Sequence, residues 1–263
     1  MISLLESFKT KKKSGHRLAS LTAYDYPMGR LLDGLGLDFI LVGDSLGMVI
    51  LGHADTTSVT MDDMQYHTAA VARGVSQTPL IADLPIHALD TPELAVENAR
   101  QLLRAGAVAV KAEGGREVLP AIQSILSEGM PVMGHLGMLP QRVREEGGYR
   151  MKGKLPAQAE EIRLDALALD AAGVFAIVLE LVSPPLAIQI SKAISAPTIG
   201  IGSGPDCDGQ ILVTHDLLGL FPWFTPGFVK PKVQLADQIE NAVSEFVAGI
   251  REGSEKPDSE ILP

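Results

Sequence analysis

The chain alternates between short apolar runs and longer segments whose apolar residues recur at helical spacing. Short runs of this kind, rich in Val, Ile, Leu and Ala, are typical of strands buried on both faces of a parallel sheet. Five of them carry a charged or imidazole side chain near the end of the run: DFILVGDS (38–45), PLIADLP (79–85), AVAVKAEG (107–114), MPVMGHLG (130–137) and VFAIVLELV (174–182).

The segments between the runs predict helices. Thr60 is expected to cap a helix that starts at Met61, and Thr91 to cap one whose first residue is Pro92, since Thr favours the N-cap and Pro the first helical turn. The segment 46–60 looks extended, and a short hairpin is predicted before the next helix.

Repetition of strand and helix predicts an α/β fold, a single-domain (β/α)8 TIM barrel over residues 17–252. Residues 1–16 are predicted to be an N-terminal extension that packs on the barrel as a helix, and 253–263 a polar tail. A doubly wound open sheet is the structural alternative. It is disfavoured because no G-x-G-x-x-G follows the first strand and because the polar residues end many strands instead of one switch point.

The alternation of side chains along a strand makes the polar residues continue apolar rows. Asp44 shares its parity with Ile40 and Val42, and Glu180 shares it with Ala176 and Val178. The same parity joins Asp83 to Ile81, Lys111 and Glu113 to Ala109, and His135 to Met133. All six are therefore expected to point into the barrel at the carboxyl ends of the strands, where such barrels place their active sites.

Three carboxylates end neighbouring strands in this prediction: Asp44, Asp83 and Glu113. Oxygen ligands without thiolate or imidazole suit Mg²⁺, and the mutual repulsion of the carboxylates favours a cation among them. The alternative is that the aspartates only cap the loops that follow the strands, as Asp often does.

The remaining candidates suggest anion binding and proton transfer. Lys111 could neutralise Glu113, bind a substrate carboxylate or form a Schiff base, and anion binding is favoured. His135 could bind substrate or be satisfied by a backbone carbonyl. Glu180 has apolar neighbours that should raise its pKa and suit it to be a general base; the alternative is a buried salt bridge to Lys111 or Arg142.

Composition narrows the class of protein. A formal net charge of −10 argues against a nucleic-acid partner. The single cysteine, Cys207, excludes an internal disulfide and a thiolate zinc site and fits a reducing compartment. No apolar segment is long enough for a membrane span, and the lysines follow the first apolar stretch, the reverse of a signal peptide. A cytoplasmic protein is predicted.

An ordered set of motifs resembles the ketopantoate hydroxymethyltransferase family. The motifs are TAYD (22–25), VGDSLGM (42–48), ADLP (82–85), VKAEGG (110–115), GHLGMLPQ (134–141), GGY (147–149), VLELV (178–182), GIGSGPDCDGQILV (200–213) and HDLLG (215–219). The order of the whole set is specific, although each piece alone is not.

The resemblance implies an activity and a role for each candidate. It implies formation of 2-dehydropantoate from 3-methyl-2-oxobutanoate and 5,10-methylenetetrahydrofolate, a step of pantothenate biosynthesis, with one Mg²⁺ per subunit. Asp44, Asp83 and Glu113 match residues near the metal, and Asp44, Asp83, Ser45, Lys111 and His135 match residues that hold the substrate. Glu180 matches the base. The family's barrels are typically homodecamers.

Two other readings remain open. One is a Mg²⁺-dependent C–C lyase or mutase of the isocitrate lyase and phosphoenolpyruvate mutase type, which is disfavoured because Cys207 lies in DCDG and not in a K-K-C-G-H-type loop. The other is a non-catalytic barrel that binds a metal and an oxo acid.

Overall fold

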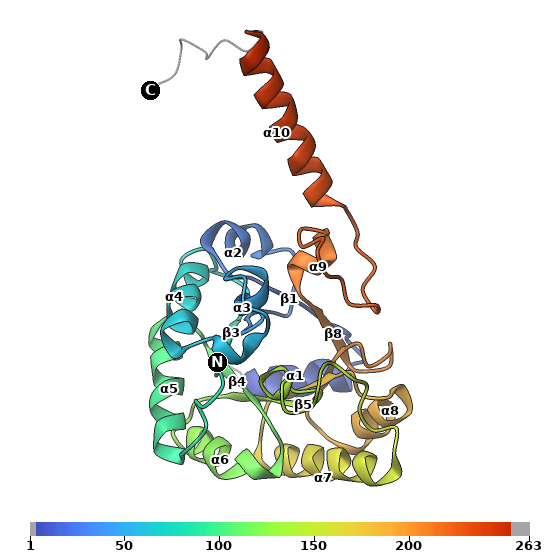
Figure 1. The fold of residues 1–263 in the computed structure, drawn as a ribbon. Helices are drawn as coiled ribbons and strands as arrows, with labels where there is room; N and C mark the ends of the chain where they lie inside the picture. Colours follow the sequence, from blue (N-terminus) through green and yellow to red (C-terminus); the bar gives the residue numbers. More distant parts are fainter. Residues whose placement is uncertain (1–3, 254–263) are drawn as a thin grey trace. The chain divides into compact units, whose positions relative to one another are not determined.

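The structure, a computed structural model, describes residues 4–253 and contains a closed barrel of eight parallel strands (Figure 1). Each strand pairs with its neighbours in sequence, and β1 closes the barrel against β8. The strands are β1 (Leu18–Thr22), β2 (Phe39–Val42), β3 (Leu80–Asp83), β4 (Ala109–Glu113), β5 (Val132–Gly137), β6 (Ala176–Glu180), β7 (Thr198–Ile201) and β8 (Gly209–Leu212). The predicted (β/α)8 TIM barrel is confirmed.

Helices follow most strands. The barrel's helices are α2 (Tyr26–Leu32), α3 (Leu46–Val49), α4 (Met61–Ala72), α5 (Pro92–Arg104), α6 (Leu119–Ser127), α7 (Pro156–Ala172) and α8 (Pro184–Ala193), with 3-10 turns η1 (Thr56–Ser58), η2 (Arg116–Val118) and η3 (Pro140–Arg142). Thr60 and Thr91 cap α4 and α5 as predicted, and Thr60 forms a capping box with Asp63. Between β7 and β8, residues 202–208 form turns and bends.

The predicted hairpin over residues 46–60 is wrong. The chain instead forms α3 and then η1. Asp55 begins η1 by accepting a hydrogen bond from the N–H of Thr57, and Arg144 of a later loop pairs with the same carboxylate at 2.7 Å. Side-chain capping satisfies this segment's backbone locally, so it needs no strand partner.

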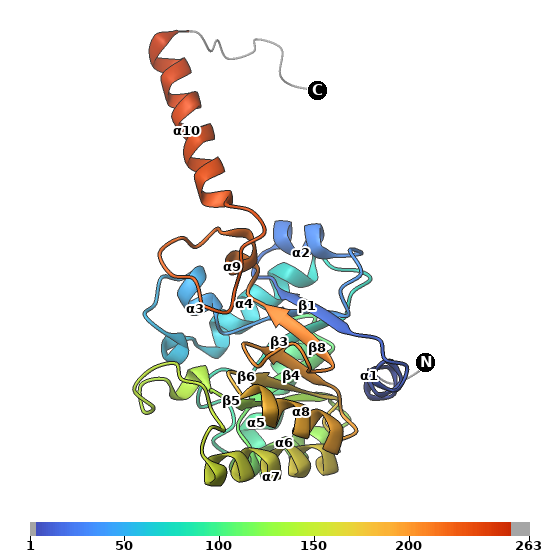
Figure 2. The same ribbon diagram turned by 90° about the vertical axis from the view of Figure 1, so that its right-hand side faces the viewer.

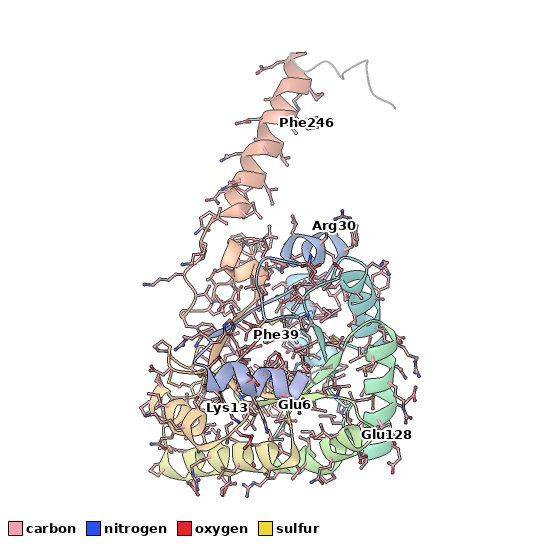
Figure 3. The ribbon with its side chains drawn as sticks, turned by 180° about the vertical axis from the view of Figure 1, so that it is seen from behind. Glu6, Lys13, Arg30, Phe39, Glu128 and Phe246 are labelled. Atoms are coloured by element: carbon pink, nitrogen blue, oxygen red, sulfur yellow. The ribbon has the colours of Figure 1, made fainter. Side chains whose placement is uncertain are left out.

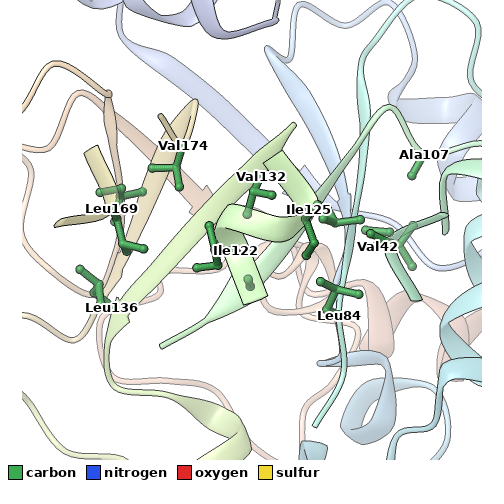
Figure 4. Packing of buried hydrophobic residues seen from close by; sticks show 14 of the residues in the cluster. Val42, Leu84, Ala107, Ile122, Ile125, Val132, Leu136, Leu169 and Val174 are labelled. Atoms are coloured by element: carbon green, nitrogen blue, oxygen red, sulfur yellow. The ribbon is translucent and has the colours of Figure 1, made fainter. Parts of the chain in front are cut away.

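Two apolar layers form on opposite faces of the sheet. One fills the barrel interior with side chains from all eight strands, among them Phe39, Ile81 and Met133. The other lies between strands and helices, where Ile122 and Ile125 of α6 pack with Val132 and Leu169 (Figure 4). The parallel sheet is thus buried on both faces, which is why its strands read as continuous apolar runs.

The interior layer corrects the predicted parity of β2. Phe39 and Leu41 point into the barrel, whereas Ile40 and Val42 belong to the layer under the helices. In β3 to β6 the predicted rows are confirmed, since Ile81, Ala109, Met133, Ala176 and Val178 all line the interior. Asp44 therefore does not continue a row of its strand; it lies two residues beyond β2, in the turn that begins α3.

Helix α1 (Leu4–Lys13) covers the barrel opening where the strands begin (Figures 2 and 3). Phe8 is 1% exposed and joins the interior layer, with its ring centroid 6.0 Å from that of Phe39 and 5.2 Å from that of Phe175. Lys12 Nζ donates to the carbonyl of Ser191 at 2.6 Å and lies 3.0 Å from Asp208 Oδ2. The assignment of residues 1–16 to an N-terminal extension stays a prediction.

The chain divides into two compact units, Met1–Val213 with the barrel and Thr214–Pro263. The second contains α9 (Thr214–Leu218) and α10 (Leu235–Glu252), and Leu217 accepts a backbone hydrogen bond from Lys232. Apart from Gly253, the predicted polar tail lies outside the described residues, and one domain over 17–252 stays a prediction. In the part of the chain that is described, no helix has the length and apolarity that crossing a membrane requires.

Candidate active site

Six predicted residues gather where the strands end. Asp83, Glu113 and Glu180 are the last residues of β3, β4 and β6. Lys111 and His135 lie within β4 and β5, and Asp44 follows β2. Their burial is nearly complete: the side chains of Asp83, Lys111, Glu113 and His135 are 5% exposed or less, and that of Glu180 is 14% exposed. Four carboxyl groups, one imidazole and the ammonium group of Lys111 therefore lie together in a largely buried space.

Lys111 is the cation at the centre of this cluster. Its Nζ lies 3.0 Å from Asp83 Oδ1 and 3.9 Å from Glu113 Oε1. Burial alone would lower the pKa of Lys111, but the carboxylates of Asp83, Glu113 and Asp44 outweigh burial and raise it. The ammonium group is therefore charged at any physiological pH and can hold an anion at the barrel mouth.

His135 connects Lys111 to Glu180. Its Nδ1 lies 3.2 Å from Lys111 Nζ, and its Nε2 lies 3.3 Å from Glu180 Oε2. Burial and the charge of Lys111 lower the pKa of His135, which favours the neutral ring. Because an ammonium can only donate, Nδ1 accepts and the ring hydrogen resides on Nε2, which lies near the Glu180 carboxylate without a hydrogen bond of good geometry.

Glu180 is a buried carboxylate with one close partner. Burial raises its pKa above the usual value for glutamate, and His135 opposes this only in part. Neither Lys111 nor Arg142 forms an ion pair with it: Arg142 pairs with Glu117 at 2.8 Å. A carboxylate that is desolvated and has a raised pKa is suited to take a proton from a bound molecule.

The backbone at Glu180 is fixed by two residues with positive φ. Gly137 (φ +99°) lies beside it on β5, where an added Cβ would come 2.3 Å from the Glu180 carbonyl oxygen, and that oxygen accepts from the N–H of Met138 at 2.8 Å. Leu181 follows with φ +48°, a conformation that is costly for a residue with a side chain. Strain of this kind is commonly found at functional sites.

Asp44 and Asp83 form the second part of the cluster. The backbone N–H of Asp44 donates to Asp83 Oδ2 at 3.0 Å, which brings the two carboxyl groups together. Burial raises the pKa of Asp44 well above its usual value, and the charges of Glu113 and Asp83 raise it further. Burial likewise raises the pKa of Glu113, to about 7. Carboxylates held under such repulsion are poised to take up a cation.

The residues present fit a divalent metal. Asp83 Oδ1 and Glu113 Oε1 are buried and form no hydrogen bond of good geometry among the described residues. No three His, Cys, Asp or Glu side chains in residues 4–253 are already gathered into a metal cage. Mg²⁺ does not need one, since it usually takes one or two carboxylates and completes its octahedron with water and substrate oxygens.

Ser45 lies beside Asp44 but faces a different partner. Its hydroxyl is 2.8 Å from the hydroxyl of Tyr24, in the TAYD motif that begins at the last residue of β1. The same oxygen lies 2.9 Å from where a Cβ on Gly43 would be, so a side chain before Asp44 would force the Ser45 hydroxyl to move. The structure thus places Ser45 at the mouth without a contact to the ionisable cluster itself.

Two residues of the cluster were not singled out from the sequence. Gln141, in η3, donates from Nε2 to Asp44 Oδ2 at 2.8 Å, and its backbone N–H donates to Glu113 Oε2 at 3.2 Å. Tyr149 comes from the following loop; burial, together with the charges of Glu180 and Asp44, raises its pKa. Both lie in the quoted motifs GHLGMLPQ and GGY, so the motifs were the available signal, but no periodicity marks a loop residue.

A cavity of about 200 Å³ opens next to Glu113. Its walls come from the segments that follow β3, β4 and β5 and combine apolar side chains with charged ones: Ile86, Leu89, Val118, Gln141, Arg142 and Glu145. The cavity therefore adjoins the carboxylate cluster at Glu113.

Solved structures share the fold. The chain is similar to a putative phosphonomutase from Burkholderia cenocepacia, with a TM-score of 0.67, 15% identity, and coverage of 92% of this chain and 100% of that one. It is also similar to phosphonopyruvate hydrolase in complex with oxalate and Mg²⁺, with a TM-score of 0.63, 15% identity, and coverage of 100% and 92%. At these identities the likeness shows the barrel fold alone.

Sequence relatives are much nearer. The chain is 49% identical over 249 residues to 3-methyl-2-oxobutanoate hydroxymethyltransferase of Acetivibrio thermocellus, covering 94% of this chain and 88% of the relative. It is 49% identical over 259 residues to the enzyme of the same name from Moorella thermoacetica, covering 97% and 96%. The family model of ketopantoate hydroxymethyltransferase matches residues 3–255. The chain belongs to the ketopantoate hydroxymethyltransferase family.

Proposed function

We propose that the protein transfers a one-carbon unit from 5,10-methylenetetrahydrofolate to 3-methyl-2-oxobutanoate, giving 2-dehydropantoate and tetrahydrofolate. Family membership and the relatives named 3-methyl-2-oxobutanoate hydroxymethyltransferase support this reaction. The observation that carries it is Glu180, a buried carboxylate with a raised pKa that lies 3.3 Å from His135, in the same cluster as Lys111. The reaction must begin by removing a proton from C3 of the oxo acid, and this carboxylate has the properties that step requires.

Mg²⁺ is the metal that the donor set favours. Asp44 and Asp83 would hold it, with Glu113 beside them, since all three offer hard oxygen atoms and two of those oxygens lack good hydrogen bonds. When bound, the metal would polarise the carbonyl of the oxo acid and so make the neighbouring C–H group more acidic.

The chain's other residues would orient the substrate and move the proton. Lys111 offers a buried positive charge to the substrate carboxylate, and Ser45 offers a hydroxyl from the adjoining turn. Glu180 takes the proton from C3. His135, whose Nε2 lies 3.3 Å from Glu180 Oε2, would stabilise the charged form of Glu180 before the transfer and keep its carboxyl group oriented after it.

The folate co-substrate is assigned to the same mouth. The cavity beside Glu113 combines apolar side chains that a flat ring could contact with charged and polar groups that could bind its edge. A homodecamer and a cytoplasmic location stay predictions from the resemblance and the sequence.

Product formation tests the proposal. Purified protein is incubated with 3-methyl-2-oxobutanoate and 5,10-methylenetetrahydrofolate, and 2-dehydropantoate is measured with Mg²⁺ and with EDTA. We expect product with Mg²⁺ and little with EDTA. Absence of product under both conditions, from protein that is folded, would reject the proposed reaction; equal product with EDTA would reject the metal.

A further inference from the structure

Gln141 joins three strand ends with one side chain and one backbone group. Its Nε2 donates to Asp44 Oδ2 at 2.8 Å and to the carbonyl oxygen of Leu84 at 3.0 Å. Its backbone N–H donates to Glu113 Oε2 at 3.2 Å. A residue of the segment after β5 is thereby attached to the carboxyl ends of β2, β3 and β4.

The orientation of the Gln141 amide follows from its partners. Asp44 Oδ2 and the carbonyl of Leu84 are both acceptors, so the atom that faces them must be the nitrogen. Turning the amide over would place its oxygen against a carboxylate and a carbonyl. Both hydrogens of Nε2 are in use, and the group has a single favourable orientation.

Position as well as polarity explains why this residue suits the site. Pro140 starts η3 and is buried, which fixes the turn from which Gln141 projects. The side chain must reach across the mouth from β5 to Asp44, and glutamine provides that length without adding a fourth negative charge. A neutral donor also leaves one oxygen of Asp44 available, whereas a second lysine would compete with a cation.

We propose that Gln141 is a positioning residue that orients the carboxylates of Asp44 and Glu113 for a divalent cation. The inference rests on the metal in the proposed function. Groups that orient ligands in this way alter metal affinity by about 10–100-fold when they are removed. Gln141 does not contact Glu180 or His135 through any hydrogen bond that the structure describes, so its effect is expected on metal binding and not on the proton transfer itself.

Metal titration without substrate provides the test. Mg²⁺ is titrated calorimetrically, and Mn²⁺ by electron paramagnetic resonance, into the wild-type protein and into Q141L, which keeps the volume and the backbone N–H but loses the amide. We expect Q141L to bind about 10–100-fold more weakly. Q141N keeps an amide but falls short of Asp44, so it should share the defect and serves as well if Q141L does not fold. Unchanged affinity in both variants would overturn the proposal.

A matched control and a second readout separate positioning from general damage. Q210L also removes one glutamine-to-carbonyl hydrogen bond, that from Nε2 to Gly204 at 3.0 Å, and should bind metal like the wild type. At saturating Mg²⁺, Q141L should recover within about threefold of the wild-type rate of C3 proton exchange. A loss that persists at saturation would refute the positioning role. If wild-type protein binds neither metal, the proposed function fails, not the assignment of Gln141 alone.

Discussion

Buried carboxylates have lowered pKa values at one end of the barrel and raised pKa values at the other. Where the strands begin, Asp38 accepts from Lys11 at 2.6 Å, from the N–H of Ala19 at 2.8 Å and lies 3.0 Å from His16 Nε2. Asp170 in the same way accepts from Ser195 and Ala196. Although burial opposes it, these donors lower the pKa of both aspartates.

Where the strands end, the carboxylates have fewer donors and more negative neighbours. Burial raises the pKa of Asp44, Glu113 and Glu180, and only one lysine is buried among them. The first arrangement stabilises the fold, and the second leaves charge available for ligands, as expected for the two faces of such a barrel. Four variants or conditions test this contrast.

Replacing the base should have the largest effect. In E180Q the side chain keeps its size and can still accept from His135, but it cannot take a proton. We expect C3 proton exchange of 3-methyl-2-oxobutanoate in deuterated water, followed by NMR, to fall by about 10²–10⁴-fold. Substrate and Mg²⁺ affinity should change little. Exchange at the wild-type rate would remove Glu180 as the base.

A substitution among the metal candidates should separate binding from stability. D44N removes a buried charge that Glu113 and Asp83 repel, so the melting temperature without metal should stay the same or rise. The rise that Mg²⁺ causes in wild-type protein should disappear, because only a ligand that binds the folded state stabilises it. Both are measured by thermal unfolding with and without Mg²⁺. A lower melting temperature of D44N without metal would contradict this prediction, because it would mean that the Asp44 carboxylate stabilises the fold.

The matching substitution at the other end should do the reverse. D38N leaves the N–H of Ala19 a partner but weakens two charged contacts, and we expect it to lower the free energy of unfolding by about 1–3 kcal/mol. In a chain of this size each kcal/mol corresponds to about 2–4 °C in melting temperature. Proton exchange per folded molecule should be unchanged. A variant that keeps its stability but loses exchange would contradict the assignment of this end to folding.

The sequence predicted the barrel and the gathering of the ionisable residues because both follow from regular patterns. Strands buried on two faces give continuous apolar runs, and a charge at the end of a run lies at the mouth. Asp44 lies at the mouth for a reason other than the predicted parity of β2. The turn at Gly43 directs it inward. The predicted cluster survives this error because Asp44 lies beyond the strand, where parity no longer applies.

Loop residues could not be placed in the same way. Gln141 is a neutral residue in an irregular segment, and its importance depends on which strand ends lie across the mouth from it. The segment 46–60 gives no helical signal because its helix is only four residues long (Leu46–Val49) and the N-cap residue, Ser45, makes no side-chain capping hydrogen bond. Periodicity needs several turns to be visible, and contacts between distant segments leave no periodic signal.

Lowering the pH should affect the two ends of the barrel at different pH values, and this is the smallest of the expected effects. Burial raises the pKa of Glu180, so on acidification this residue gains its proton at a pH above that of an ordinary glutamate, and exchange falls there. The folded state then binds more protons than the unfolded chain, and this titration does not favour unfolding. Asp38 has a lowered pKa, so its contribution to stability is present above the pKa of the unfolded chain and is lost only as pH falls through the lower, folded value.

Exchange rate and circular dichroism measured over the same pH series should therefore show loss of activity before loss of structure. Coincident transitions would mean that the carboxylates at the mouth also hold the barrel together.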